Sequence, residues 1–571
     1  MTRSGYIFGP VGPVGSGNPP MSPTYQKADK QNREGFPAFT RTLEEDVLSV
    51  LLTQTLSNTF YCSQKELAKE TVDVLRAMAD KDPEFLAKAL AYARTKGLMK
   101  LAPTVGLAVL ASKKTSNKKE AFRLAFRQVV KIPDDLREFV TLLKTKQFTK
   151  GLVGIPKTMV QNWLRHMSEY HAVKYGSANS EGITLRDILR LAHPRPKTTK
   201  PNKGLDYERL RNGAQAELFG WLVKGWSEIG TEPSPTNPMV WALEKLKRTD
   251  SVVESVALIE KYKLPREVVE PSVKKMTEAH WAALLKNLPY MALLRNLNTM
   301  LRHGVFEVKE TVKKVAKHLA DPENVQKSKQ FPFRFWNAFK ALKAEAPQEL
   351  RDALSDALEA SFVNMPLIKG RVCLFNDISS SMDSKVSDKS DTTLSEIAAM
   401  FAAATLKRCE DEVLLVPFDD VAHPELGKVS RRDSMMSIVK QIGITRGGTN
   451  LGAPIEYLLK KKIAVDVLIG FTDNEDWAGR GFLTYFEQYK REINPKAKAF
   501  LVTLAPYRDY VAPAGYPDVY FIMGWSESIL RYIPLMLEGG VGQVEDVRNI
   551  DLRTYGKKEA VEETAEAVAE D

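Results

Sequence analysis

The hydrophobic pattern of the chain changes near residue 371, and this change constrains the fold more than any other feature. From about residue 43 to 363, apolar residues recur at helical spacing in short segments separated by proline, glycine and polar residues. From residue 371 onward, short apolar runs alternate with helical segments. We therefore predict two architectures in one chain, a long all-helical region followed by an α/β region.

Within the helical region, successive amphipathic segments of similar length are expected to pair along the chain. The stretch "KETVDVLRAMADKDPEFLAKALAYARTKG" (69–97) contains two of them, and Pro83 and Pro103 stand where helices are expected to begin. No strict repeat period is visible. Because each helix pair must bury its apolar stripe against the next pair, we expect a helical solenoid, which can close into a ring.

The C-terminal part is predicted to form a doubly wound parallel sheet. Its strands are expected to be buried on both faces, because their apolar runs are continuous. These runs lie at residues 372–375, 412–418, 464–472, 498–505 and 518–524. The helical segments between them lie at residues 394–409, 434–443, 452–461 and 482–493.

The two parts differ in charge. Residues 1–365 hold 57 Lys and Arg against 39 Asp and Glu, a net charge of +18, whereas residues 366–571 hold 25 against 32, a net charge of −7. The surplus is densest in residues 101–200, with 19 basic and 7 acidic residues. Such a field attracts polyanions, and nucleic acid is the leading candidate. The alternative is that these charges only solvate the helix faces.

Further features limit where the protein works. No apolar run approaches the roughly 20 residues of a membrane helix, and the N-terminus lacks the apolar core of a secretion signal. Three distant cysteines argue against a disulfide framework or a cysteine zinc site. We therefore predict a cytoplasmic protein with a flexible arm at 1–30 and an acidic tail at 551–571.

Oxygen-bearing side chains follow the predicted strands at the edge where ligands bind in such sheets. The first strand runs into "NDISSSM" (376–382), and later strand-end segments are "TRGGTNLG" (445–452) and "LIGFTDNEDW" (468–477). They offer two carboxylates and three hydroxyls without sulfur or imidazole, which suits a hard cation such as Mg²⁺. The candidate ligands are Asp377, Ser379, Ser381, Thr449 and Asp473.

Two alternatives to a metal centre stay open at this point. Asp and Ser also form turns and helix caps, so the first motif alone is weak. A catalytic Mg²⁺ site is the other, since Glu475 and Asp476 lie close by in sequence. The phosphate-loop, zinc-protease and hydrolase motifs are absent from the sequence, which makes an enzyme the minority hypothesis.

Together the three segments resemble the metal-ion-dependent adhesion site of von Willebrand factor A domains, over residues 368–548. In that family three loops carry D-x-S-x-S, a threonine and an aspartate. The resemblance therefore assigns metal binding to the five candidate ligands, with an open coordination position for a carboxylate of a partner.

Four helical segments are similar to the Ro RNA-binding proteins, whose helical module is called TROVE. They are "LSNTFYCSQKEL" (56–67), "ITLRDILRLAHPRP" (183–196), "LPYMALLRNLNTML" (288–301) and "FPFRFWNAFKAL" (331–342). The metal loop "FTDNEDW" (471–477) also fits this family. The resemblance covers residues 31–550, in the family's order, and points to a bacterial or phage-like member.

This resemblance implies a ring of HEAT-like helical repeats at 31–366, closed with help from an A domain at 367–550. In the family, small structured Y RNAs bind a basic outer surface, and single-stranded 3′ ends of misfolded noncoding RNAs enter the central hole. Bacterial members are tethered through a Y RNA to the exonuclease polynucleotide phosphorylase. The implied protein is a monomeric scaffold and RNA chaperone without catalysis of its own.

The resemblance also suggests RNA-binding residues. For the outer surface it points to Lys174 and His193, and more basic residues cluster around the histidine in sequence: Arg186, Arg190, Arg195 and Lys197. For the hole the candidates are Lys150, Arg295 and Arg334. Structural alternatives stay open, because a lone histidine often caps a helix and an arginine on an apolar face can pair with a carboxylate.

A second function for the whole chain is a metal-dependent protein-recognition adaptor. In that case the A domain binds a carboxylate of another protein, and the basic solenoid forms a protein-binding groove. RNA binding should weaken steeply as salt rises, whereas a metal-centred protein contact should be lost in EDTA.

Overall fold

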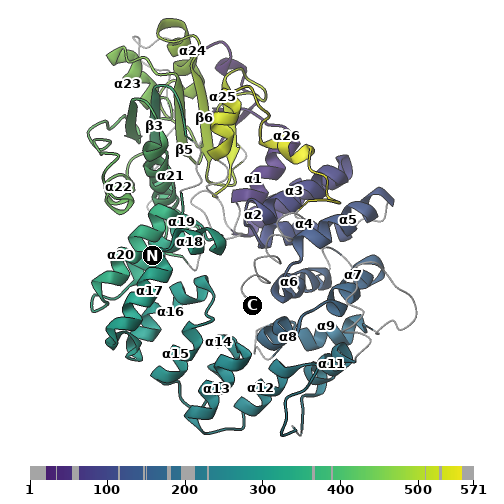
Figure 1. The fold of residues 1–571 in the computed structure, drawn as a ribbon. Coiled ribbons are helices and arrows are strands. Elements are labelled where there is room, and N and C mark those ends of the chain that lie inside the picture. The colour runs from purple at the N-terminus through teal and green to yellow at the C-terminus, as the bar shows by residue number, and fades with distance from the viewer. Residues whose placement is uncertain are drawn as a thin grey trace, which may run out of the picture.

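The computed structural model describes the chain from residue 21 to residue 555 with interruptions. The described residues are 21–33, 35–53, 64–112, 116–145, 148, 151–176, 182–194, 213–227, 230–362, 367–387, 390–507, 509–525 and 530–555. Figure 1 shows a helical ring with an α/β domain set into it, as the sequence predicted.

The first half of the ring is built from amphipathic helices with local capping signals. Pro83 begins α3, and the backbone N–H of Phe85 donates to the Asp82 carboxylate at 2.9 Å, which caps that helix. The helices are α1 (Leu43–Thr53), α2 (Gln64–Lys81), α3 (Pro83–Thr95), α4 (Leu101–Ala111), α5 (Ser116–Val129), α6 (Pro133–Lys144), α7 (Gly154–Arg165), α8 (Glu169–Gly176), α9 (Leu185–Ala192) and α11 (Ala214–Lys224).

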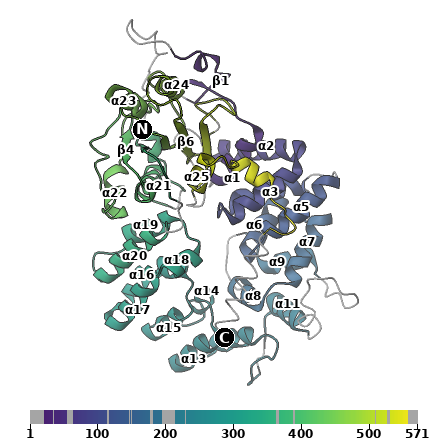
Figure 2. The same cartoon turned by 45° about the horizontal axis from the view of Figure 1, so that its top comes forward.

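These helices form two layers. In the outer layer α3, α5, α7, α9 and α11 contact one another in succession, and in the inner layer α2, α4, α6 and α8 do the same. Figures 1 and 2 both place α6 and α8 nearer the centre of the ring than α7 and α9. This two-layer stacking is the solenoid that the paired amphipathic segments predicted.

The second half of the ring continues the chain of helix contacts. Its helices are α12 (Pro238–Leu246), α13 (Val252–Tyr262), α14 (Arg266–Val269), α15 (Glu278–Leu285), α16 (Tyr290–Arg302), α17 (Lys309–Ala320), α18 (Pro322–Ser328), α19 (Pro332–Ala341) and α20 (Gln348–Ala360). Contacts run from α8 to α12, from α13 to α15 and from α16 to α19, while α20 packs on α17 and α19.

The C-terminal domain contains a five-stranded parallel sheet in the order β4-β3-β5-β6-β7. Its strands are β3 (Val372–Asp377), β4 (Val413–Phe418), β5 (Val467–Thr472), β6 (Lys498–Thr503) and β7 (Val519–Met523), and each coincides with a predicted apolar run. The helices are α21 (Leu394–Arg408), α22 (Met435–Ile442), α23 (Ala453–Lys461), α24 (Phe482–Glu492), α25 (Tyr532–Leu537) and α26 (Gln543–Arg548). Helix α21 packs on the sheet and on α22, and α23 packs on α24.

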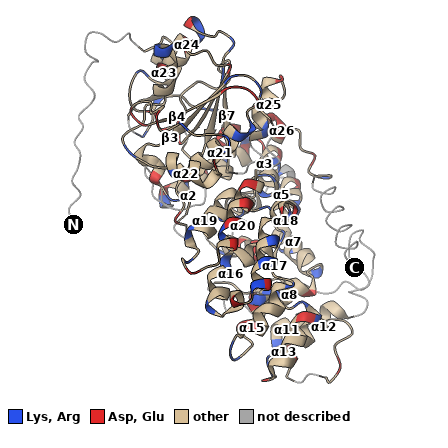
Figure 3. Cartoon of the chain, turned by 60° about the vertical axis from the view of Figure 1, so that its left-hand side comes forward, with Lys and Arg blue, Asp and Glu red and all other residues tan. Residues whose placement is uncertain are grey.

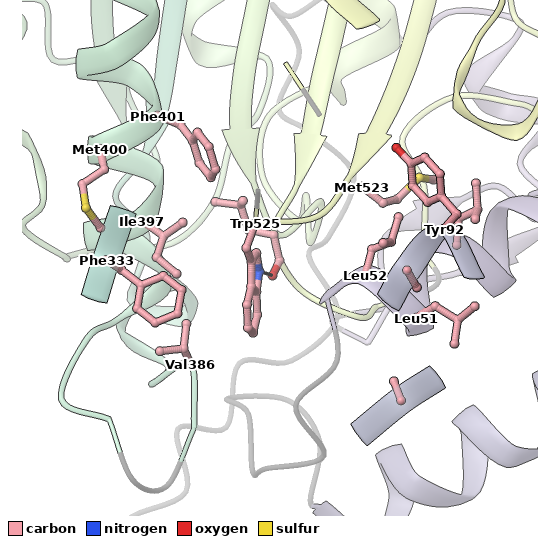
Figure 4. Packing of buried hydrophobic residues seen from close by; sticks show 14 of the residues in the cluster. Leu51, Leu52, Tyr92, Phe333, Val386, Ile397, Met400, Phe401, Met523 and Trp525 are labelled. Carbon is pink, nitrogen blue, oxygen red and sulfur yellow. Dashed lines mark hydrogen bonds between the residues drawn. The ribbon is translucent and has the colours of Figure 1, made fainter. Parts of the chain in front are cut away.

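The α/β domain closes the ring because it contacts both ends of the helical region. At one end α26 packs on α3 and α1 contacts β7, and at the other α19 and α20 pack on α21 and α22. The hydroxyls of Tyr92 and Tyr532 lie 3.1 Å apart at the first junction. At the second, the rings of Phe333 and Trp525 meet edge to face at 6.4 Å. Figure 4 shows Trp525 between buried side chains of α19 and α21, such as Phe333 and Phe401, and those of α1 and α3, such as Leu52 and Tyr92.

The ends of the described chain differ from the predicted arm and tail. Residues 21–30, expected in a flexible arm, pack on the α/β domain: Tyr25 is fully buried, and the Ser22 N–H donates to Thr484 Oγ1 at 3.0 Å. The short strands β1 (Lys30–Gln31) and β2 (Pro37–Ala38) follow. At the other end Tyr555, expected in the acidic tail, bonds to α3 and α5. Burying these aromatic side chains favours ordered ends.

We expect Gly481→Ala to lower the free energy of unfolding by about 1–3 kcal/mol. Gly481 has φ +77°, and a Cβ there would lie 2.4 Å from the Tyr25 ring. Gly515 is the matched control, because its φ is +70° but no atom lies within 4 Å of its Cβ position. Chemical denaturation of both variants separates backbone strain from the Tyr25 contact, and equal losses would show that residues 21–30 do not pack as described.

None of the described helices has both the length and the apolar composition needed to cross a membrane. Cys373 and Cys409 are buried free thiols, and burial raises the pKa of each to about 12.

Candidate metal centre and basic surfaces

The predicted metal ligands meet at the carboxyl edge of the sheet. Asp377 ends β3 and Asp473 directly follows the neighbouring strand β5, so their carboxylates come from adjacent strand ends. Thr449 lies in the loop before α23. That loop is tied to the other two, because the Ser380 N–H donates to Gly447 O at 3.1 Å and the Trp477 N–H donates to Thr449 O at 3.1 Å.

Hydrogen bonds hold the first motif in place. Thr472 Oγ1 donates to Asp377 Oδ2 at 2.6 Å, and the Ser379 N–H donates to Asp377 Oδ1 at 2.9 Å. The hydroxyls of Ser379 and Ser381 lie 3.1 Å apart. The D-x-S-x-S segment therefore forms a compact cradle of oxygen atoms rather than an ordinary exposed turn.

The chemistry of this cradle fits a hard cation. All five predicted ligands are at most 2% exposed. Burial, and the nearby charge of Asp473, raise the pKa of Asp377 to about 7, a cost that a bound cation would remove. The buried Thr449 hydroxyl has no hydrogen-bond partner among the described residues. No group of three His, Cys, Asp or Glu side chains in the described ranges forms a metal site by itself, so hydroxyl oxygens would be needed.

The two acidic residues considered for catalysis have other surroundings. Asp476 accepts the backbone N–H groups of Leu451 and Phe482, each at 3.0 Å, so it holds the loops together. Glu475 accepts the Arg33 N–H at 3.3 Å, and burial followed by the charge of Asp473 raises its pKa to about 9. The contact with Arg33, from the N-terminal segment, has no signal in the sequence.

On the outer layer, α9 presents a basic face. Its apolar residues other than the exposed Leu191 are buried, while Arg186, Arg190 and His193 are exposed at helical spacing and lie on one side. Arg190 also lines a cavity of about 520 Å³ together with Lys144, which the sequence did not single out. His193 ends the helix with φ +48°, so it caps α9 as the structural alternative proposed, and its exposed ring stays accessible.

The structure does not bring Lys174 onto this face. Lys174 lies on α8, and its Nζ is 3.5 Å from the Glu267 carboxylate on α14. Arg186 has a structural contact as well, since its Nε donates to Leu222 O at 3.1 Å. Three further candidates, Lys150, Arg195 and Lys197, lie outside the described residues.

A second group of basic side chains comes from segments that are far apart in sequence. Arg295 on α16 is exposed, and Arg334 on α19 is half-buried. Desolvation, followed by the charge of Arg295, lowers the pKa of Arg334. Desolvation, and then the charges of Arg94 and Arg295, also lower the pKa of Lys100, which precedes α4, while the carboxylates of Asp135 and Asp134 act against this shift. No motif in the sequence had singled out Lys100. We call Lys100, Arg295 and Arg334 the inner cation group.

No carboxylate of the described residues forms an ion pair with Arg295 or Arg334. This disfavours the alternative in which Arg295 is a structural ion-pair partner. Elsewhere the charges are mixed, and Figure 3 shows acidic and basic residues close together over α16, α17 and α20. The inner cation group therefore differs from the solvated helix faces of the same half-ring.

A two-layered helical ring closed by an α/β domain with this oxygen-rich edge defines the architectural class. A model of the TROVE domain matches residues 48–355, and a model of the Ro60 vWA domain matches residues 371–534. Because the TROVE match spans more than half of the chain, the chain belongs to the TROVE-domain Ro60 family.

Individual relatives agree with this assignment. The chain is 25% identical to the RNA-binding protein RO60 of Deinococcus radiodurans over 557 residues, which cover 92% of this chain and 98% of that protein. It is 26% identical to the RNA-binding protein RO60 of Caenorhabditis elegans over 409 residues, covering 63% of this chain and 62% of that protein. The crystal structure of the Deinococcus radiodurans RO (RSR) protein matches with a TM-score of 0.61 at 20% identity, over 88% of this chain and 100% of that one.

Proposed function

We propose that this protein is an RNA-binding scaffold. It binds a small, Y-like noncoding RNA through the exposed basic face of α9 and single-stranded ends of misfolded RNA through the inner cation group. It thereby serves RNA quality control in the cytoplasm, as a monomer that delivers RNA to an exonuclease such as polynucleotide phosphorylase. The relatives named RNA-binding protein RO60 support the RNA class of ligand.

The inner cation group is the observation that carries the proposal. Its members come from three helical segments far apart in sequence, yet Arg295 affects the pKa of both Arg334 and Lys100. Lys100 also interacts with the carboxylates of Asp135 and Asp134, but Arg295 and Arg334 form no ion pair among the described residues and repel one another. A bound polyanion relieves that repulsion. The phosphate backbone of a single strand supplies closely spaced negative charges.

Sequencing the RNA that copurifies from the native host tests the proposal. We expect enrichment of a small folded RNA, and of RNAs with single-stranded ends, over the RNA recovered with an unrelated basic protein. The affinity for these RNAs should fall steeply with salt. Recovery of the background RNA population alone would contradict the function.

We also propose that Asp377, Ser379, Ser381, Thr449 and Asp473 hold Mg²⁺ or another divalent cation. The cation would neutralise the two buried carboxylates and offer a coordination position for a partner's carboxylate. The unpartnered Thr449 hydroxyl and the raised pKa of Asp377 support this assignment.

Metal binding predicts a stabilisation that can be measured without RNA. With Mg²⁺ at about 100 times its Kd, we expect the thermal midpoint of the A domain to rise by roughly 5–10 °C. The rise should disappear in Asp377→Asn. Asp476→Asn is the control, since Asp476 accepts backbone N–H groups and is not a proposed ligand. The same rise in Asp377→Asn as in the unchanged protein would contradict the site.

A protein-recognition adaptor remains the second candidate, and one feature favours it. The exposed apolar residues Val421 (57%) and Ile444 (39%) flank the Arg446–Asp419 ion pair beside the metal loops. Such a rim suits a protein partner. This function would be favoured over the scaffold if the chain bound another protein, if EDTA abolished that binding, and if no RNA were enriched.

A further inference from the structure

Aromatic side chains gather around one lysine where α7 meets α8. The rings of Trp163 and His171 are stacked, with centroids 6.4 Å apart and planes at 19°. The rings of Tyr170 and Tyr175 lie 6.1 and 6.2 Å from His171. The Lys174 Nζ is 5.7 Å from the centroid of each tyrosine ring. We call these five residues the α7–α8 aromatic cluster.

The cluster is not ordinary core. All five side chains are half-buried, whereas the large aromatic side chains of the core, such as Trp281, are fully buried. Trp163 packs against the hydrophobic core, but Tyr170 and Tyr175 are not among the described residues that do so. Two tyrosines left partly open to water, next to a third and a fourth ring, form a surface that can accept another flat group.

The cluster is also held in position before any ligand arrives. Trp163 Nε1 donates to Val130 O at 3.1 Å, which fixes the indole against the end of α5. Lys174 is oriented by Glu267 at 3.5 Å. Burial, and then the charge of Lys174, lower the pKa of His171, which favours the neutral form of its ring. A neutral imidazole stacks as an aromatic ring without competing for the phosphate.

Combined aromatic faces and a cation are the features with which proteins bind single-stranded nucleic acid, because every base has a face that can stack. We propose that the α7–α8 aromatic cluster binds an unstacked RNA nucleobase, which stacks on its rings while Lys174 contacts the adjacent phosphate. The inference rests on the RNA-binding function proposed above and assigns it a site with a defined chemistry. It also gives Lys174 a role apart from the α9 face, from which the structure separates it.

Binding of single-stranded RNA by fluorescence polarisation tests the inference. The probes are an oligoadenylate and an abasic oligonucleotide of the same length. Tyr170→Leu combined with Tyr175→Leu is expected to weaken oligoadenylate binding roughly tenfold, while binding of the abasic probe stays unchanged. The ratio between the two affinities then falls by the same factor. Tyr170→Phe with Tyr175→Phe should restore binding, since the rings are kept.

Tyr262→Leu is the matched control. Tyr262 is half-buried and has a lysine, Lys261, 5.4 Å from its ring, but it packs against the core beside Trp241. This variant is expected to bind both probes as the unchanged protein does. Circular dichroism verifies that each variant is folded. If the double variant unfolds, the single variant Tyr170→Leu is tested instead, with the same comparison of the two probes.

The outcomes separate the inference from the function on which it rests. If the unchanged protein binds neither probe, the RNA-binding function fails. If it binds RNA but the double leucine variant binds each probe as tightly as the unchanged protein does, the function stands and the stacking site is overturned. A variant that loses both probes to the same extent would also overturn it, because the loss would then concern phosphate contacts rather than bases.

Discussion

Replacing both Arg295 and Arg334 by alanine is expected to weaken the binding of single-stranded RNA about 25-fold at about 0.1 M salt. Each phosphate contact on a single strand contributes a salt slope of about −0.7, equal to about fivefold at 0.1 M relative to 1 M salt. Two lost contacts therefore multiply to about 25-fold and make the slope shallower by about 1.4. A salt titration with a single-stranded oligonucleotide measures both quantities.

Two lysines of the same half-ring provide the control for this charge removal. Lys313 and Lys314 on α17 are exposed and have no ion-pair partner among the described residues. Figure 1 places α17 farther from the centre of the ring than α16. Lys313→Ala with Lys314→Ala should leave the slope within about 0.3 of the unchanged value, since exposed cations away from a bound phosphate release no counterions. Equal effects of both double variants would mean that only net charge matters.

Replacing Trp525 by alanine is expected to destabilise the protein by about 3–5 kcal/mol and to loosen the ring. Trp525 is 4% exposed, donates its indole N–H to Leu504 O at 2.8 Å and meets the Phe333 ring of α19. The substitution removes a large side chain at the junction between the α/β domain and the end of the helical region (Figure 4). Chemical denaturation measures the stability, and small-angle X-ray scattering measures the radius of gyration, which should increase.

Trp226→Ala serves as the control for ring closure. Trp226 is half-buried and lies between α11 and α12, away from both junctions. We expect a smaller loss of stability and no change in the radius of gyration. An unchanged radius for Trp525→Ala as well would contradict the role of this contact in closing the ring.

The order of helices and strands could be predicted because it follows from local periodicity. All five predicted strands are present, and the first even runs through Asp377, the residue placed just beyond it in sequence. The position of the candidate metal ligands at one edge of the sheet could be predicted for the same reason. Parallel strands end at one edge of a sheet, so Asp377 and Asp473 had to come together once both segments were recognised as strand ends.

Contacts between segments far apart in the chain could not be predicted. Lys100, which precedes α4, interacts electrostatically with Arg295 on α16, far away in sequence, and no local pattern marks that approach. The Arg33 contact with Glu475 depends in the same way on residues 21–30 packing on the α/β domain. Burial of Tyr25 drives that packing, and its sequence surroundings, rich in Gly and Pro, indicated a flexible arm instead.

Ultraviolet crosslinking of the protein to its RNA in the native host, followed by mass spectrometry of the crosslinked peptides, tests the central claim most directly. The scaffold predicts crosslinks within the helical ring, in peptides that contain α8, α9, α16 or α19. In the Arg295 and Arg334 double variant, the crosslinks in α16 and α19 should be lost. Crosslinks confined to the A domain, or none above those of an unrelated basic protein, would contradict the account.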